Sequence, residues 1–560
     1  MPHMKIPWYN MPPGGVFVCN HSQPEMTALS DNSLLVWNET VMNEYRDLNL
    51  TCFYACIARG KHDWAWSYVN KTFFDPKTIN YPKIDCEFIH VQCFNGTVRL
   101  YSDFHAQILP LEDRLKHLQS LVPTEQRRRY HHVIVMVYDS ESRLNFIRMC
   151  PKSLKVLKTL YKATLFEGFG KTGENSFPNG LAMLTGKFWG NFTMKARYQT
   201  PFDAWDMVWK QFANNSYLTW FGEDEAWLNL FTYNKGGFLN QPTDHRLRPY
   251  MQACSSDAVC RTNGHLCVSH TKLHNVIAVL LQLQPVLERR QFQIGFADED
   301  FANFLTRNYE LLKNAFLFVM GDHGQRFTSI RSTRIGTYED AMPLFSMSIP
   351  LDLRSSHPEL ETIMLRNSKL LTSNHDLHVT FHDIIDSQRR HWWGNFTEAK
   401  VLTDTGTHFP ASQSLLRPLS DQRTCADVGI EEPHCFCQTF TELPLTDPRV
   451  GNISTALVDH MNTQMTNYSK CARLTLNHTL NAEIKAHKSN ATAVNYHLDK
   501  NRYRITVEAA PSGGLFQAEL VFNGTDYIVR GDVSRINKYG NQARCIKHDI
   551  LRKYCFCMSD

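Results

Sequence analysis

The stretch VIVMVYD, Val133–Asp139, decides the fold that the sequence predicts. An unbroken apolar run that ends in an acid is typical of a strand buried on both faces. A second stretch, FLFVMGDHG at Phe316–Gly324, has the same form and ends in Asp322 and His323. Ligands of open α/β sheets bind at the carboxyl ends of the strands, so we expect Asp139 to lie close to Asp322 and His323. Carboxylate and imidazole groups that converge in this way indicate a metal site.

The segment between these strands, GENSFPNGLAMLTG at Gly173–Gly186, predicts a turn followed by an apolar helix. Ser176 stands at the start of that helix, where free backbone N–H groups and the helix dipole favour an anion. A serine in this position has two interpretations. It is either an N-cap that satisfies the helix end, or a nucleophile beside the predicted cation. In the second case Asn175 is placed to donate a hydrogen bond to the oxygens of an ester.

Several further motifs accompany these features, in order along the chain: YDSESR at 138–143, NSFPN and MLTG within 175–186, PTDHRLRP at 242–249, GDHGQRF at 321–327 and a C-terminal CFC. Together they resemble the alkaline phosphatase superfamily, which includes sulfatases, nucleotide pyrophosphatase/phosphodiesterases and an animal family known as DUF229. The resemblance is nearest to DUF229 and spans roughly residues 85 to 560. It implies an α/β core with a mixed, largely parallel sheet and helices on both faces.

The resemblance also implies roles for individual residues. Ser176 takes the position of the nucleophile and binds the metal, and Asp139, Asp322 and His323 are metal ligands. A shared ion requires these four side chains to converge within about 6 Å. The implied cofactor is a divalent metal, zinc first, with calcium or manganese as alternatives. The implied substrate is a phosphate or sulfate ester, carried on a glycan, a lipid or a nucleotide.

A second metal position is less complete. Superfamily members that bind two metals supply a further Asp and His before the D-H-G strand, whereas here Phe292–Asp300 reads FQIGFADED and runs into an expected helix at Phe301–Lys313 without a His. About a dozen residues are missing relative to the family pattern. The substitutes that we consider are Asp298, Asp300, His375, Asp376 and, in the predicted ligand set, His378. The sequence therefore predicts an impaired hydrolase, with a catalytically inactive binding or structural protein as the alternative.

Other nucleotide and sulfatase motifs fit poorly. Gly168–Gly173 is a literal G-x-G-x-x-G, but the acid expected about 20 residues later is absent. A P-loop ending at Lys171 would need glycine where the chain has Leu165. The sulfatase signature C/S-x-P-x-R is incomplete because Gly180 stands in place of the arginine, so formylglycine chemistry is not expected. The T-F-P-N turn of phosphodiesterases is nearer, with Ser176 for the threonine.

The length and charge of the chain bound its organisation. A chain of 560 residues is too long for a single core, and a net charge of +4 gives no support to nucleic-acid binding. We expect a Cys-rich N-terminal cap at 1–125, an alkaline-phosphatase-like core at 126–420 and a small β-rich module at 421–560. Within the core, helices are expected at Lys152–Lys162, Leu273–Gln284 and Ala302–Lys313.

The sixteen cysteines indicate disulfides. Two segments share the spacing C-x9-C-x-C, one from Cys425 to Cys437 and one from Cys545 to Cys557. Zinc binding is the alternative, but structural zinc sites usually use closer C-x2-4-C pairs. Since each segment is too short to bury a core alone, we expect the two to pack together in one module.

The sequence also contains thirteen N-x-S/T sequons, which become glycosylated only in the secretory pathway. They indicate a protein that is secreted or lies on the outer face of a membrane and carries N-linked glycans. The first residues, MPHMKIPWYN, lack the apolar core of a signal peptide, and no run approaches the ~20 apolar residues of a membrane span. We therefore expect a signal or anchor that this chain does not contain.

Overall fold

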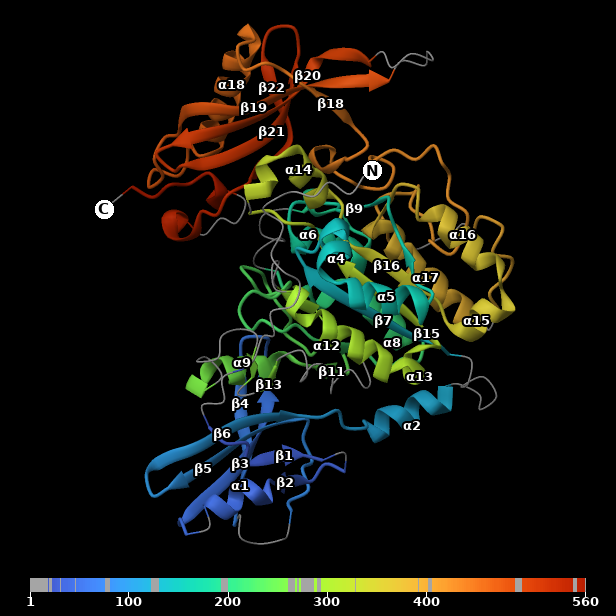
Figure 1. Cartoon of the computed structure of the whole chain (residues 1–560), viewed down its shortest axis with the longest axis vertical. Coiled ribbons are helices and arrows are strands. Elements are labelled where there is room, and N and C mark those ends of the chain that lie inside the picture. The colour runs from blue at the N-terminus through green and yellow to red at the C-terminus, as the bar shows by residue number, and fades with distance from the viewer. Residues whose placement is uncertain are drawn as a thin grey trace.

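A computed structural model gives the fold of the chain (Figure 1). It describes residues 19 to 558 except 20–22, 31, 46, 76–80, 122–129, 193–199, 260–266, 269–270, 273–286, 290–293, 328, 391, 401–404, 489–495 and 547–550. The helix expected at Leu273–Gln284 lies outside the described residues. Figure 1 shows three parts along the longest axis of the molecule: an N-terminal sheet, a central α/β body and a C-terminal sheet.

The central body is built on a five-stranded sheet with the order β14-β7-β15-β16-β8. Its strands are β14 (Leu287–Arg289), β7 (His132–Asp139), β15 (Ala315–Gly321), β16 (Phe345–Ser348) and β8 (Thr164–Leu165). Strands β14, β7 and β15 are parallel, whereas β16 and β8 each pair antiparallel with their neighbours. The sheet is mixed, as predicted, but it is not largely parallel, because only three of its five strands form parallel pairs.

The direction of β16 follows from the connection that precedes it. After β15, the chain forms α14 (Arg334–Ala341), whose end stays near the carboxyl end of β15 because the Gly324 N–H donates to the Asp340 carbonyl at 3.0 Å. The chain thus re-enters the sheet at the end where β15 left it. A strand that re-enters there must run antiparallel.

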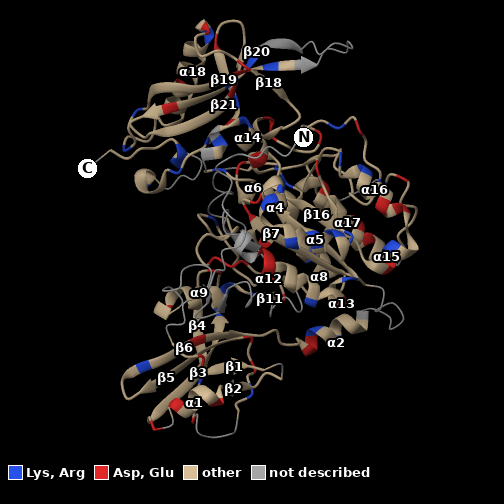
Figure 2. Ribbon diagram, viewed as in Figure 1, with Lys and Arg blue, Asp and Glu red and all other residues tan. Residues whose placement is uncertain are grey.

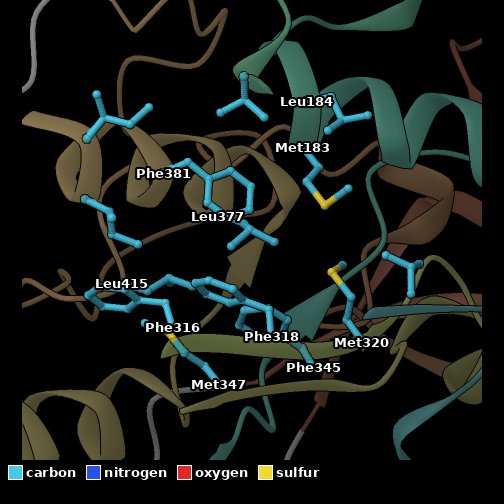
Figure 3. Close-up of a cluster of buried hydrophobic side chains, with 14 of the residues drawn as sticks. Met183, Leu184, Phe316, Phe318, Met320, Phe345, Met347, Leu377, Phe381 and Leu415 are labelled. Carbon is cyan, nitrogen blue, oxygen red and sulfur yellow. The ribbon is translucent and has the colours of Figure 1, made fainter. Parts of the chain in front are cut away.

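Helices cover both faces of this sheet, as predicted. Along β15, Phe316, Phe318 and Met320 belong to one core cluster, whereas Ala315, Leu317 and Val319 belong to another. The first cluster packs under α6 (Ser176–Thr185), α8 (Val208–Asn214) and α17 (Asn374–Arg389), part of which Figure 3 shows. The second packs under α4 (Arg143–Met149), α5 (Pro151–Thr159), α12 (Ile294–Arg307) and α13 (Tyr309–Leu312). The period-two alternation of a buried strand explains both layers.

The N-terminal sheet is antiparallel, with the order β4-β3-β5-β6. Its strands are β3 (Leu50–Arg59), β4 (Trp66–Phe74), β5 (Phe88–Asn95) and β6 (Val98–Ala106), and it is accompanied by β1 (Thr27–Leu29), β2 (Leu35–Trp37) and α1 (Glu39–Glu44). Disulfides join Cys52 to Cys93 and Cys56 to Cys86, so they tie β3 to β5 and to the segment just before it. Helix α2 (Glu112–Leu121) follows this sheet.

The C-terminal sheet is antiparallel in the order β18-β19-β20-β21-β22. It comprises β18 (Thr439–Glu442), β19 (Thr475–Lys488), β20 (Tyr496–Ala510), β21 (Gly514–Phe522) and β22 (Tyr527–Arg535), and helix α18 (Pro448–Gln464) packs on it through a shared apolar cluster. Disulfides Cys471–Cys555 and Cys545–Cys557 close the second C-x9-C-x-C segment onto this cluster.

The two C-x9-C-x-C segments belong to different apolar clusters, so among the described residues they do not share the single core that the sequence predicted. Cys425 bonds to Cys435, and this pair forms a separate cluster with Val428 and Ile430 that contacts Leu371 of the central body. The second segment instead lies in the cluster of the C-terminal sheet. Repeated spacing therefore does not produce a repeated environment here, because each segment covers a different apolar surface.

The remaining elements are short. They are β9 (Phe169–Gly170), β10 (Trp220–Phe221), β11 (His245–Arg246), β12 (Cys267–Val268), β13 (Thr271–Lys272), β17 (Thr372–Ser373), α9 (Arg248–Ser256), α15 (Leu351–Ser356) and α16 (Glu359–Asn367). Acidic and basic residues occur in all three parts of the chain (Figure 2). Within the described residues, every helix is too short or too polar to cross a membrane.

Candidate metal and nucleophile site

Asp139 and Asp322 lie side by side at the carboxyl ends of two adjacent parallel strands. The register of β7 and β15 pairs Val137 with Met320, so the acids two residues further on are again neighbours. Because side chains alternate along a strand, each acid lies on the same face of the sheet as the apolar residue two positions before it. Val137 and Met320 both belong to the cluster beneath α6, and this places both carboxylates on the side of the sheet that carries Ser176.

His323 completes a group of three possible ligands. Single ligand atoms of Asp139, Asp322 and His323 all lie within 4.8 Å of one another. The Nδ1 of His323 lies 2.8 Å from the Gly324 carbonyl, to which it donates, so Nε2 carries the lone pair. That nitrogen lies 3.4 Å from Asp322 Oδ2. A histidine whose second nitrogen is fixed by a carbonyl is oriented as metal ligands usually are.

The two oxygens of Asp322 have different environments. Oδ1 accepts hydrogen bonds from the backbone N–H groups of Ser140 at 2.7 Å and His323 at 2.8 Å. Oδ2 is buried without a hydrogen-bond partner among the described residues. Burial raises the pKa of Asp322, and Asp139 reinforces this effect, whereas His323, the Ser176 hydroxyl and the Ser140 N–H oppose it. A bound cation would satisfy Oδ2 and relieve the repulsion between the two carboxylates, so the donor set fits a metal ion.

Backbone geometry holds this corner tightly. Ser140 has a φ of 62°, in the left-handed region, and its hydroxyl donates to Asp139. Gly321 and Gly324 flank the Asp-His pair, and a Cβ at either position would approach a backbone oxygen to 2.1 Å and 1.9 Å, respectively. Strained non-glycine residues concentrate at functional sites. No larger residue fits at Gly324, the glycine of the D-H-G turn, or at Gly321 just before it.

Ser176 is the first residue of α6, and its Oγ lies 3.5 Å from His323 Nε2. The loop before it is fixed by Asn179, whose Oδ1 accepts from the N–H groups of Thr172 at 2.7 Å and Gly173 at 3.1 Å. The structure thus brings the predicted nucleophile together with the three predicted acid and imidazole ligands. Ser176 as a residue is half-buried, so it is not sealed from solvent.

The N-cap of α6 is Asn175, not Ser176. Asn175 Oδ1 accepts from the Phe177 N–H at 3.2 Å. Since that N–H is used and Pro178 has none, the helix end offers an anion fewer hydrogen bonds than the sequence suggested. The positive end of the helix dipole remains. The Nδ2 amide of the exposed Asn175 is the group that can face an ester oxygen.

His378 is not brought to this group. Its Nδ1 lies 3.0 Å from the Met183 carbonyl and its Nε2 lies 2.7 Å from the Thr405 carbonyl. A ring nitrogen that faces a carbonyl oxygen is not placed to bind a metal, so we leave His378 out of the ligand set proposed below. Desolvation, as the largest effect, lowers the pKa of this histidine.

Two of the other candidates for a second metal position, Asp298 and Asp376, cap helices, and a third, His375, packs against an aromatic ring. Asp298 is buried in α12 and caps α5, because its carboxylate accepts from the N–H groups of Lys152 at 3.0 Å and Ser153 at 2.8 Å. Asp376 belongs to the capping box of α17 and also binds Arg423. His375 packs against Phe409, with ring centroids 4.5 Å apart.

The start of α12 differs from the sequence prediction. The helix begins at Ile294 rather than near residue 301, so the end of the segment Phe292–Asp300 is helical and Asp298 lies within the helix.

Two cationic side chains, Lys235 and Arg326, lie near the residues that flank Ser176 and were not among the site residues predicted from the sequence. Lys235 Nζ lies 4.7 Å from the centre of the Phe177 ring, and Arg326 Nε lies 3.7 Å from Glu174. Both line a cavity of about 230 Å³ that Asn175 borders and that Arg535 and Lys553 of the C-terminal region also line. Arg326 lies within the GDHGQRF motif and was therefore findable, whereas Lys235 stands in a loop without a pattern.

The comparisons identify the family. The α/β body carries two Asp and a His at the carboxyl ends of its strands, with a Ser at the start of a helix beside them. The chain matches the family described as a protein of unknown function, DUF229, over residues 16–480, and it belongs to that family. This confirms the family predicted from the sequence motifs, but the match begins earlier than the predicted residue 85 and ends at residue 480 rather than 560. No curated protein matches the chain.

Solved structures give more distant matches. The C-terminal periplasmic domain of EcEptC from Escherichia coli in complex with Zn is 12% identical and aligns over 53% of this chain and 88% of its own, with a TM-score of 0.32. The soluble domain of lipooligosaccharide phosphoethanolamine transferase A from Neisseria meningitidis is 11% identical over 47% and 90%, with a TM-score of 0.31. The lipoteichoic acid synthase LtaP from Listeria monocytogenes is 10% identical over 59% and 83%, with a TM-score of 0.31.

Proposed function

We propose that the protein is an extracellular, metal-dependent hydrolase of a phosphate or sulfate ester, with Ser176 as its nucleophile. The observation that carries this proposal is the buried Asp322 Oδ2, which has no hydrogen-bond partner in the described structure and faces His323 Nε2 at 3.4 Å. Asp139 and Ser176 lie beside the same point. Such a set of oxygen and nitrogen donors suits a divalent cation, with zinc the first choice and calcium or manganese the alternatives.

In this proposal Asp139, Asp322, His323 and Ser176 hold the metal. The ion supplies positive charge that lowers the pKa of a bound hydroxyl and stabilises anionic oxygens. Ser176 Oγ then forms a bond to phosphorus or sulfur as the ester's alcohol leaves, and water later releases the phosphate or sulfate from the serine. Asn175 Nδ2 donates to an ester oxygen, and Lys235 and Arg326 attract the substrate's negative charge.

An extracellular location is supported by the sequons. Of the thirteen asparagines, ten stand where the structure describes exposure, and all ten are exposed. They are Asn38, Asn49, Asn70, Asn95, Asn214, Asn395, Asn452, Asn467, Asn477 and Asn523. Together with the disulfides at both ends of the chain, this pattern supports a secreted glycoprotein. Release of N-glycans by peptide N-glycosidase from protein made in animal cells should leave aspartate at these positions, and unmodified asparagine at all of them would contradict the assignment.

The second candidate is a catalytically inactive relative that binds a ligand. One observation favours it: within the described residues, Asp139, Asp322 and His323 are the only mixed group of carboxylate and imidazole ligands. Asp298, Asp376 and His378 are engaged elsewhere. A site with one metal would hydrolyse poorly if the reaction requires two.

The experiment combines metal content with turnover. Protein secreted from animal cells is assayed for bound metals by mass spectrometry and for release of p-nitrophenol from p-nitrophenyl phosphate, its diester and p-nitrophenyl sulfate. One metal ion per chain, with turnover that disappears in Ser176→Ala, would support the hydrolase. Bound metal with the same negligible turnover in both proteins would support the inactive relative. A protein that binds no divalent metal at micromolar concentration would overturn the metal site.

A further inference from the structure

An apolar cavity of about 200 Å³ extends from the candidate site along the sheet. Its floor is the face of β7 that carries Val133, Val135 and Val137, and residues of α6 and α8 form its walls. Met183, Leu184, Met320 and Phe381, which Figure 3 shows in the packed cluster, also line it.

The floor is more open than a central strand normally is. Strands in a sheet with helices on both faces are usually buried on both sides. On β7, Ile134 and Met136 are buried beneath the opposite helices, but Val133 and Val135 are only half-buried. The helices above β7 therefore leave room over the valines. Apolar cavities of about 150 Å³ stay dry and bind small hydrocarbons, so this one is large enough for a ligand.

The cavity is continuous with the proposed chemistry. Ser176 and Asp322 line one end of it, and the row Val133, Val135, Val137 leads along one face of β7 to Asp139. A group attached to an ester at Ser176 can therefore extend into an apolar space without leaving the site. Little polar surface competes for that group, because most of the lining side chains are aliphatic or aromatic.

The walls also hold hydrogen-bond donors that a ligand could use. Trp209 Nε1, Trp220 Nε1 and Asn374 Nδ2 are buried and have no partner among the described residues, and all three residues line the cavity. A buried donor without a partner costs free energy, so unpaired donors in the wall of a cavity indicate that a ligand pairs with them. Oxygen atoms of a ligand, such as those of an acyl ester, would satisfy them.

We propose that the cavity binds the hydrocarbon chain of the substrate, which makes the substrate class a lipid-like phosphate or sulfate ester. This inference rests on the proposed function for the position of the ester at Ser176. The binding of the chain itself depends only on the cavity. The two parts can therefore fail separately.

The experiment uses four probes on the secreted protein: 1-octanol, octyl phosphate, ethyl phosphate and, as the second headgroup, octyl sulfate. Binding is measured by titration calorimetry on Ser176→Ala, so that nothing is consumed. Each buried methylene is expected to raise affinity about fourfold. Octyl phosphate or octyl sulfate should thus bind more tightly than ethyl phosphate by two orders of magnitude or more, and 1-octanol should bind measurably.

Two variants fill the cavity. Val135→Phe adds a ring above β7, and Leu230→Trp adds bulk from a loop residue that lines the cavity and is half-buried. The matched control is Val98→Phe, on β6, where the side chain is 60% exposed. Thermal unfolding checks that each variant folds. Both cavity variants should lose at least tenfold in affinity for octyl phosphate and keep their affinity for ethyl phosphate, while Val98→Phe changes neither.

The outcomes separate the two proposals. Equal affinities for octyl and ethyl phosphate, or unchanged octyl phosphate binding in both cavity variants, would overturn the chain-binding site even if metal and turnover are present. The protein could bind octanol, lose that binding in the cavity variants, and yet show neither metal nor turnover. That result would support the chain-binding site but overturn the proposal that the bound chain belongs to a substrate. Faster hydrolysis of octyl than of ethyl esters, lost in both cavity variants, would support the inference as a whole.

Discussion

Ser176 Oγ lies 3.5 Å from His323 Nε2, although 147 residues separate them in the chain. The two come from different elements: Ser176 begins α6, and His323 follows β15. The loop in front of α6 is fixed by Asn179 and the turn after β15 by Asp322. Two independently rigid segments therefore place a hydroxyl and an imidazole at one point, which is what a preorganised metal and nucleophile site requires.

Replacing Asp322 tests the metal site most directly. Asp322→Asn keeps Oδ1, which accepts the hydrogen bonds of Ser140 and His323, but replaces the buried Oδ2 by an amide. Substitutions of outer partners lower metal affinity about 10–100-fold, so loss of a direct ligand should cost about 100-fold or more. Titration of the metal-free protein with zinc gives the measurement.

The matched control is Asp298→Asn, the same change at another buried carboxylate. Asp298 caps α5 and lies outside the ligand group, so its variant should bind zinc as tightly as the unmodified protein. It should lose about 1–3 kcal/mol of unfolding free energy, because the amide leaves the N–H of Lys152 or Ser153 without an acceptor. A drop in zinc affinity for Asp298→Asn, or none for Asp322→Asn, would contradict the assignment of ligands.

Asn175 and Ser176 should contribute differently to stability. Asn175 caps α6, so Asn175→Ala is expected to lower the free energy of unfolding by about 1 kcal/mol. Ser176→Ala removes a hydroxyl that caps nothing and should stay within about 0.5 kcal/mol. Urea denaturation of the metal-free variants measures both. The reverse order would restore Ser176 as the structural cap and weaken its role as a nucleophile.

The sequence was sufficient for the part of the site that depends on strand periodicity. Asp139 and Asp322 each end a buried apolar run, and two parallel strands in register must then bring the acids together. The position of Ser176 followed from the turn and helix pattern. Its capping role did not, because asparagine and serine are both common caps and only the backbone geometry decides which of two adjacent residues fills that position.

Features that depend on long-range packing could not be predicted. The antiparallel direction of β16 follows from where α14 lies, and no local pattern records it. His378 has metal-ligand chemistry, but carbonyls that are far away in the chain occupy both of its nitrogens. Lys235 lies over the ring of Phe177, next to Ser176 in the chain, and it comes from a loop whose sequence carries no motif. In each case the partner in space, rather than the neighbour in sequence, decides the role.

Glu431 should make stability depend on pH. Burial, reinforced by Asp532 and Glu174 and opposed by Lys171 and Lys553, raises its pKa from 4.5 to about 7. Because the folded pKa is above the unfolded one, the folded state holds the proton more strongly. The associated stability is complete below pH 4.5 and is lost as the pH rises through about 7.

Glu431→Gln removes this dependence. At pH 8 the variant should be more stable than the unmodified protein by about 1–3 kcal/mol, and near pH 4.5 the two should be similar. Urea denaturation at several pH values measures the difference. The exposed Glu44→Gln serves as the control and should leave the profile unchanged. Parallel profiles for Glu431→Gln and the unmodified protein would show that this carboxyl titrates normally.

Cys437 should behave differently from its counterpart in the second C-x9-C-x-C segment. Cys557 is bonded to Cys545, whereas Cys437 is an exposed free thiol next to the Cys425–Cys435 disulfide. In the folded, unreduced protein, N-ethylmaleimide should therefore label Cys437 and leave Cys557 unlabelled. Peptide mass mapping measures this.

Substitutions in the first segment extend the test. Cys437→Ser should abolish labelling there and change the free energy of unfolding by no more than about 0.5 kcal/mol, since the side chain is exposed and closes no loop. Cys435→Ser opens the disulfide to Cys425 and should cost about 2–4 kcal/mol. If Cys437 is labelled only after the protein is reduced, it forms a disulfide, which would contradict the prediction. The two C-x9-C-x-C segments would then both have their last cysteine paired.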